Sequence, residues 1–151
     1  MEALAAEYEA ATKFVADIIA SLSTDDLDKH QVGGWSPRQV IHHLADSEAQ
    51  SYARLRRLIA EPEGSLIQGY DEAAWANNEI LGYTELPVEN SIAVLLAVRA
   101  ASLDILKRLK DSDLSKTGIH SESGSYSIGK WLKVYTNHPR DHGYQIKEAL
   151  A

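Results

Sequence analysis

Cysteine is absent from this sequence of 151 residues. Its absence excludes disulfide bonds, thiolate nucleophiles and cysteine-ligated zinc sites together. A bound metal ion would therefore need histidine, aspartate or glutamate ligands. The absence leaves the compartment open, because a cysteine-free chain tolerates both reducing and oxidising surroundings.

Basic charge and long apolar runs are also scarce. Fifteen Lys and Arg residues against twenty-two Asp and Glu residues give a formal net charge of −7. Since a phosphate-binding surface is normally basic, we expect no nucleic-acid partner. No apolar run approaches the ~20 residues of a membrane span. Residues 1–4 (Met-Glu-Ala-Leu) lack the basic start of a signal peptide, so we expect a cytoplasmic protein without a membrane partner.

The length suits one domain, residues 1–151, with a hydrophobic core of its own. Four helices joined by one long crossover, residues 64–87, predict an all-α four-helix bundle. The helices are expected where apolar residues recur at helical spacing: residues 3–22, the segment between Pro37 and Pro62, the segment that follows Pro87, and the segment from Ser127 onward.

Two connecting segments carry weaker signals. Within the crossover, residues 70–75 (Tyr-Asp-Glu-Ala-Ala-Trp) are expected to form a short helical piece. Residues 111–127 are polar and contain Gly118 and Gly124. This composition predicts a loop or a small hairpin.

The second helix has the clearest start in the sequence. Ser36 is the expected N-cap, Pro37 the first helical residue, and Gln39 completes a capping box. From this start, the apolar stripe places His43 at its edge and directs His42 away from it. Of the two histidines, His43 is therefore the one expected to face the bundle interior.

The inner faces of the last two helices follow from the same spacing. For the third helix we expect an apolar core side: Ile92, Leu95, Leu96, Leu103, Leu106 and Leu109. For the fourth helix the inner face combines aromatic, aliphatic and histidine side chains: Trp131, Tyr135, His138, His142, Ile146 and Ala149. The fourth helix thus turns two histidines toward the interior.

His138 and His142 are four residues apart, which places both side chains on one helix face, one turn apart. Two imidazoles at this spacing reach one metal ion, and His43 from another helix would supply a third ligand. Three protein ligands with an open position are typical of a catalytic metal site. The alternative is that the histidines fill core space. Pro139 between them predicts either a kink that spoils the spacing or a freed backbone carbonyl.

Two charged residues, Glu48 and Arg99, fall within apolar stripes. We favour a buried or half-buried ion pair, or an arginine that reaches outward to solvent. The functional alternative makes Glu48 a general base near the metal and Arg99 an anchor for an anionic substrate. Asp46 is a further candidate base, and Asp46 and Asp141 are candidates to orient a ligand histidine.

Two motifs resemble the DinB/YfiT-like superfamily, and in particular its YfiT-type branch of metal-dependent hydrolases. They are Gly-Gly-Trp-Ser at residues 33–36, which leads into His-His-Leu-Ala-Asp-Ser at residues 42–47, and His-x-x-x-His-x-x-Gln-Ile at residues 138–146. The resemblance spans nearly the whole chain. Two departures are Asp141, where many relatives carry histidine, and Pro139.

The resemblance implies an up-down-down-up bundle and a divalent ion, zinc or alternatively nickel, held by His43, His138 and His142. It also implies a cytoplasmic protein, often a homodimer. Some members of the wider superfamily are transferases or isomerases that use thiols such as bacillithiol or mycothiol.

We therefore expect a metal-dependent hydrolase that activates water against a small-molecule substrate. Two alternatives stay open. The first is a metal-dependent thiol S-transferase, in which the ion would lower the pKa of a low-molecular-weight thiol such as bacillithiol. The second is a metal-binding helical module without catalysis.

Overall fold

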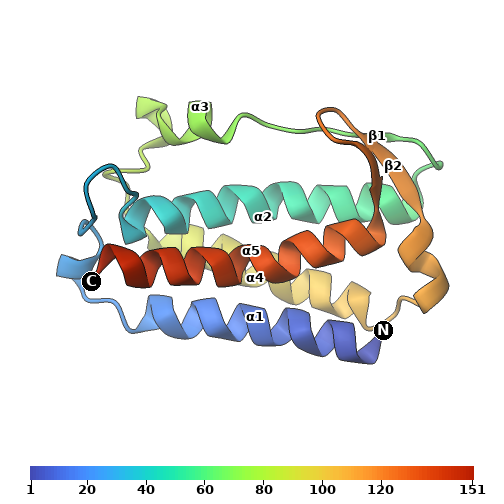
Figure 1. Ribbon diagram of the computed structural model, residues 1–151, viewed down its shortest axis with the longest axis horizontal. Helices are drawn as coiled ribbons and strands as arrows, with labels where there is room; N and C mark the ends of the chain where they lie inside the picture. The colour runs from blue at the N-terminus through green and yellow to red at the C-terminus, as the bar shows by residue number, and fades with distance from the viewer.

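Four long helices form most of the computed structural model, which describes all residues, 1–151. They are α1 (Glu2–Ala20), α2 (Pro37–Ala60), α4 (Glu89–Leu106) and α5 (Ile128–Ala149). Figure 1 shows α2 and α4 running in one direction and α1 and α5 in the opposite one. The predicted up-down-down-up bundle is confirmed.

The helices occupy the corners of a square. Both α1 and α2 pack against α4 and α5, so α1 and α2 lie at opposite corners. Between α1 and α5, side chains of α1 pack directly against Gly143. A Cβ atom at Gly143 would lie 2.7 Å from Cε1 of Phe14, so only glycine fits without a shift of that ring. None of the helices combines the length and apolar character that a membrane span requires.

The start of α2 follows the sequence prediction. The Ser36 hydroxyl accepts a hydrogen bond from the Gln39 amide at 3.4 Å, and Gln39 Oε1 accepts one from the Ser36 amide at 3.0 Å. The two bonds satisfy amide groups that the first helical turn leaves free. This capping box fixes the start of α2, and with it the direction of the histidines that follow.

The crossover between α2 and α4 returns the chain along the outer side of α2 (Figure 1). It contains strand β1 (Leu66–Ile67), helix α3 (Glu72–Ala76) and the 3-10 helix η2 (Glu79–Leu81). The short helix expected over residues 70–75 is therefore present. Strand β1 was not expected, and it belongs to a small sheet at one end of the bundle.

Of the two alternatives for residues 111–127, the structure has the hairpin. Strands β2 (Thr117–His120) and β3 (Gly124–Ser127) pair antiparallel, and β1 joins β2 in parallel. Two further 3-10 helices, η1 (Thr24–Asp26) and η3 (Asp111–Ser115), lie in the remaining connections. A Cβ atom at Gly118 would lie 2.7 Å from the Ser65 carbonyl oxygen, so glycine permits β1 and β2 to approach.

The apolar core has two parts, with polar side chains between them. One part surrounds Trp131 near the start of α5, and the other surrounds Ile146 near its end. Glu48 of α2 and Arg99 of α4 are buried between the two parts. The expectation for Leu96 was wrong: Leu95 is fully buried, whereas Leu96 is 38% exposed. Leu96 turns outward because α4 directs Arg99, four residues after Leu95, into the interior.

Candidate metal centre

Three histidines from two helices meet where α2 packs against α5; His43 is buried, and His138 and His142 are half-buried. His43 lies on α2, and His138 and His142 lie on α5. The Nε2 atom of His138 is 3.1 Å from Nε2 of His43 and 3.1 Å from Nε2 of His142. One nitrogen from each ring lies within 4.8 Å of the other two. The structure thus brings together the three residues that the sequence predicts as ligands.

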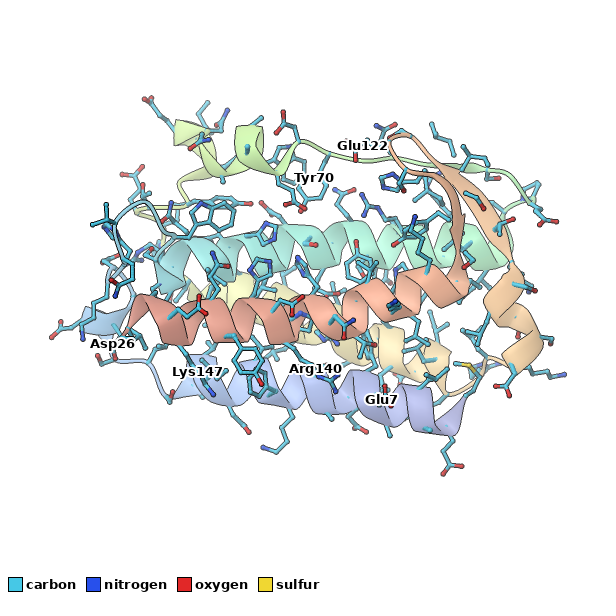
Figure 2. All side chains as sticks on the ribbon, viewed as in Figure 1. Glu7, Asp26, Tyr70, Glu122, Arg140 and Lys147 are labelled. Carbon is cyan, nitrogen blue, oxygen red and sulfur yellow. The ribbon has the colours of Figure 1, made fainter.

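The spacing of the α5 histidines survives the proline between them. Helix α5 continues through Pro139 to Ala149, and Pro139 itself is buried. His138 and His142 therefore keep the one-turn separation that directs both rings to the same place. On the α1 side of the same turn, Arg140 donates to the Glu7 carbonyl at 3.4 Å, and Figure 2 shows both side chains between α1 and α5.

Burial keeps the three imidazoles neutral. It lowers the pKa of His43 to about 4, with a smaller contribution from repulsion by His142. Burial also lowers the pKa of His138, and the neighbouring histidines and Arg99 lower it further. For His142, burial lowers the pKa against the opposing effects of Gln145 and nearby carboxylates. Neutral imidazole is the form that binds metal ions, so the site is prepared for one at neutral pH.

Hydrogen bonding fixes which nitrogen of His142 faces the cluster. Gln145 Oε1 accepts a hydrogen bond from His142 Nδ1 at 2.7 Å. Because a neutral imidazole has a single N–H, Nε2 of His142 then presents its lone pair to the other two rings. This role of Gln145 was not predicted from the sequence, although Gln145 lies three residues after His142 on the same face of α5.

The three nitrogens cannot satisfy one another with hydrogen bonds. A hydrogen on His138 Nε2 can form one good hydrogen bond, but two neighbouring Nε2 atoms lie 3.1 Å away. One of these two atoms is therefore left without a partner. In addition, the Nδ1 atoms of His43 and His138 are buried without a hydrogen-bond partner. A divalent ion would take up all three Nε2 lone pairs at once, as it does in three-histidine sites. The donor set therefore fits a metal ion better than it fits a packed core.

Aromatic rings surround the cluster. The Trp35 ring meets His43 edge-on with 5.3 Å between centroids, and Tyr135 meets His138 in the same manner at 6.2 Å. Tyr83 lies beyond Trp35 and donates its hydroxyl hydrogen to Asp46 at 2.6 Å. These rings limit contact between the histidines and bulk water.

Asp46 and Asp141 are the two residues that the sequence suggested as partners for a ligand histidine, and their contacts differ from the hydrogen bond between Gln145 and His142. Asp46 accepts the Tyr83 hydroxyl hydrogen. Asp141 is exposed on α5 and acts on His142 only through its charge, which raises the pKa of that ring slightly against the effect of burial. A carboxylate at position 141 therefore favours the charged form of His142.

His42 is buried as well, but outside the cluster. Its Nδ1 atom lies 2.8 Å from the Ser91 hydroxyl oxygen and its Nε2 atom 3.1 Å from the Leu86 carbonyl oxygen. His42 thus fastens the end of the crossover and the start of α4 to α2. Adjacent histidines have separate tasks because they leave the helix about 100° apart.

Glu48 and Arg99 form a buried ion pair, as the favoured interpretation has it. Arg99 Nη1 donates to Glu48 Oε1 at 2.6 Å, and neither side chain exposes any surface. Burial raises the pKa of Glu48, and the Arg99 charge opposes that rise. The functional roles of the two residues, as general base and substrate anchor, stay predictions.

Comparison with known proteins gives a family match over most of the chain. The sequence matches the DinB superfamily over residues 7–146. A protein of Oceanobacillus iheyensis named "Putative metal-dependent hydrolase OB0782" is 39% identical over 137 residues, which are 90% of this chain and 77% of that protein. "Putative metal-dependent hydrolase BcerKBAB4_2443" of Bacillus mycoides is 34% identical over 93% of this chain and 79% of its own length.

Two solved structures are similar to this fold. YfiT from Bacillus subtilis, described as "a probable metal-dependent hydrolase with an unusual four-helix bundle topology", aligns with a TM-score of 0.86 and 26% identity. The alignment covers 98% of this chain and 84% of YfiT. The four-helix bundle protein TT2238 aligns with a TM-score of 0.66 and 20% identity over 97% of each chain, and it supports the fold alone.

Proposed function

Since this chain belongs to the DinB superfamily and gathers three histidines at one point, we propose that it is a metal-dependent hydrolase of small molecules. The observation that carries the proposal is the convergence of the Nε2 atoms of His43, His138 and His142. Three neutral nitrogen donors leave coordination positions open, which is the arrangement of catalytic sites. The names of the relatives support the same class of reaction.

The histidines would hold a divalent ion, and we propose zinc, with nickel as the alternative, because imidazole suits both metals. Such an ion supplies Lewis acidity, which lowers the pKa of water toward ~7 and polarises a substrate carbonyl group. Gln145 keeps Nε2 of His142 available to the ion by holding the proton on Nδ1. Trp35 covers one side of His43 and keeps that side apolar.

The roles of Glu48 and Arg99 need a different assignment from direct contact with substrate. Both side chains are fully buried and bonded to each other. We propose that they act through the backbone and the helices that they join. Asp46, which accepts a hydrogen bond from the Tyr83 hydroxyl, remains a candidate for the general base. A homodimer and a cytoplasmic location also stay proposals.

The decisive experiment tests the purified protein for two reactions, hydrolysis and thiol transfer. The zinc-loaded and nickel-loaded forms are offered a panel of p-nitrophenyl esters and anilides, with and without bacillithiol and an electrophilic acceptor. A hydrolase releases nitrophenol or nitroaniline without thiol, and His43→Ala loses that activity. His42→Ala is the matched control, because His42 is an adjacent buried histidine outside the cluster.

Each other outcome selects an alternative. Consumption of the electrophile only when bacillithiol is present would replace the hydrolase with a thiol S-transferase. Full metal loading without turnover in either assay would leave a metal-binding helical module.

A further inference from the structure

A backbone carbonyl inside α5 has lost its helical partner. Pro139 has no N–H, so it cannot donate to the carbonyl of Tyr135, four residues earlier. Tyr135 is only 2% exposed, and water is therefore not the ready substitute that it is on a helix surface. An unpaired buried carbonyl costs free energy and invites a kink. The gap lies directly beside His138 and one turn before His142.

Arg99 of α4 closes this gap. Its Nη1 atom donates to the Tyr135 carbonyl oxygen at 2.9 Å and to Glu48 Oε1 at 2.6 Å. The donor comes from another helix and takes the place of the amide that proline lacks. The α5 backbone beside His138 is therefore connected to α4 by a charged hydrogen bond.

The same guanidinium group is fixed from two further sides. Its Nε atom donates to the Thr12 hydroxyl at 2.6 Å, and its Nη2 atom donates to the Tyr8 carbonyl at 3.1 Å. Its Cζ atom lies 3.8 Å from the centroid of the Tyr8 ring. One side chain of α4 thus bonds to α1, α2 and α5. Because the guanidinium is planar and its donors are rigid, these partners determine where Nη1 lies.

We propose that Arg99 is a positioning residue of the metal centre, which sets the separation of His138 and His142 by holding the Tyr135 carbonyl that Pro139 leaves free. Arginine at position 99 and proline at position 139 are then coupled. With alanine at position 139, the helix supplies its own N–H to Tyr135, and the Arg99 bond is no longer required for the geometry of the histidines. The inference rests on the proposed function only in taking the three histidines as metal ligands.

A purely structural ion pair makes a different prediction. If Arg99 only neutralised Glu48, its replacement would have the same effect with proline or with alanine at position 139. The coupling between the two positions therefore separates the two roles, and a double-mutant cycle measures it.

The cycle consists of the wild type, Arg99→Lys, Pro139→Ala and the double variant, each purified metal-free. Lysine keeps the positive charge near Glu48 but cannot reproduce the planar set of donors. Cobalt(II) is titrated into each protein, and the d–d absorption reports both affinity and coordination geometry. We expect Arg99→Lys to weaken cobalt binding by about tenfold or more and to change the spectrum with Pro139 present, and to weaken it less than about threefold with alanine there. Equal losses in both backgrounds, or no loss in either, would overturn the proposal.

Two further measurements test the proposal if Arg99→Lys folds poorly or if the protein binds no metal. Should Arg99→Lys not fold, Glu48→Gln combined with Arg99→Met removes both charges and is tested in the same two backgrounds. Amide hydrogen exchange of residues 140–143 in the metal-free protein is expected to accelerate on loss of Arg99 only when Pro139 is present. If the wild type binds no cobalt, the metal-centre proposal fails, while this exchange experiment still supports or refutes the Arg99–Pro139 coupling.

Discussion

The Nε2 atoms of His43 and His138 lie 3.1 Å apart, although 95 positions separate the two residues in the sequence. The contact depends on the packing of α2 against α5. Neither helix alone forms the cluster: α5 contributes two histidines with local spacing, and α2 contributes the third only after the bundle has formed. Substitutions in the cluster, beside it and in the core of the bundle should therefore have separate effects on metal binding and on stability.

Gln145→Leu should weaken metal binding without unfolding the protein. Leucine cannot accept the hydrogen from His142 Nδ1, so the His142 ring loses the bond that fixes its tautomer and direction. Loss of such a partner typically costs 10- to 100-fold in metal affinity. Zinc competition against a chromophoric chelator measures the change. Gln145→Glu, which keeps an acceptor, is the matched control, and equal affinity in Gln145→Leu and the wild type would contradict the assignment.

Metal-free protein should lose stability as the pH falls below about 6.5. The folded pKa of His43 is about 4, whereas an unfolded histidine titrates near 6.5. Between these values the unfolded chain binds a proton that the folded one does not, so unfolding becomes easier as the pH decreases. At pH 5 the His43 contribution is about 2 kcal/mol. His138 and His142 act with the same sign.

Urea unfolding at pH 7.5, 6.0 and 5.0, followed by tryptophan fluorescence, measures this effect. The wild type should lose more stability across the series than His43→Gln does. A series in which His43→Gln and the wild type change in parallel would refute the prediction.

Leu95→Ala and Leu96→Ala should differ sharply, although the residues are neighbours. Leu95 is fully buried, and truncation of a buried leucine costs about 2–5 kcal/mol. Leu96 is 38% exposed, so its truncation should cost less than about 1 kcal/mol. Free energies of unfolding in urea give both values. Similar losses for the two variants would mean that α4 faces the core with a different side.

The features that depend on local sequence were predicted well. Ser36, Pro37 and Gln39 mark the start of α2 because capping involves only neighbouring residues. The placement of His138 and His142 on one helix face could be predicted from their spacing of four residues. The inward direction of His43 followed from the apolar stripe of α2, counted from that well-defined start. The convergence of the three histidines could therefore be predicted before the helices were seen together.

The features that were missed depend on contacts between distant segments. The two residues of β1 form a strand because they pair with β2, more than fifty positions later, and two residues carry no periodicity. Leu96 was expected in the core because it lies at helical spacing from Ile92 and Leu103. Arg99 takes the interior position because Glu48, Thr12 and two backbone carbonyls accept hydrogen bonds from it there. Such polar partners are not visible in the sequence of α4.

The metal content of protein purified without chelators or a histidine tag tests the central claim most directly. We expect about one equivalent of zinc or nickel in the wild type and in His42→Ala, and none in His43→Ala or His138→Ala. His42 is the control because it is buried next to His43 and bonds to Ser91 instead of joining the cluster. A wild type that holds no metal, even after incubation with zinc and nickel, would contradict the account and make the three histidines core residues.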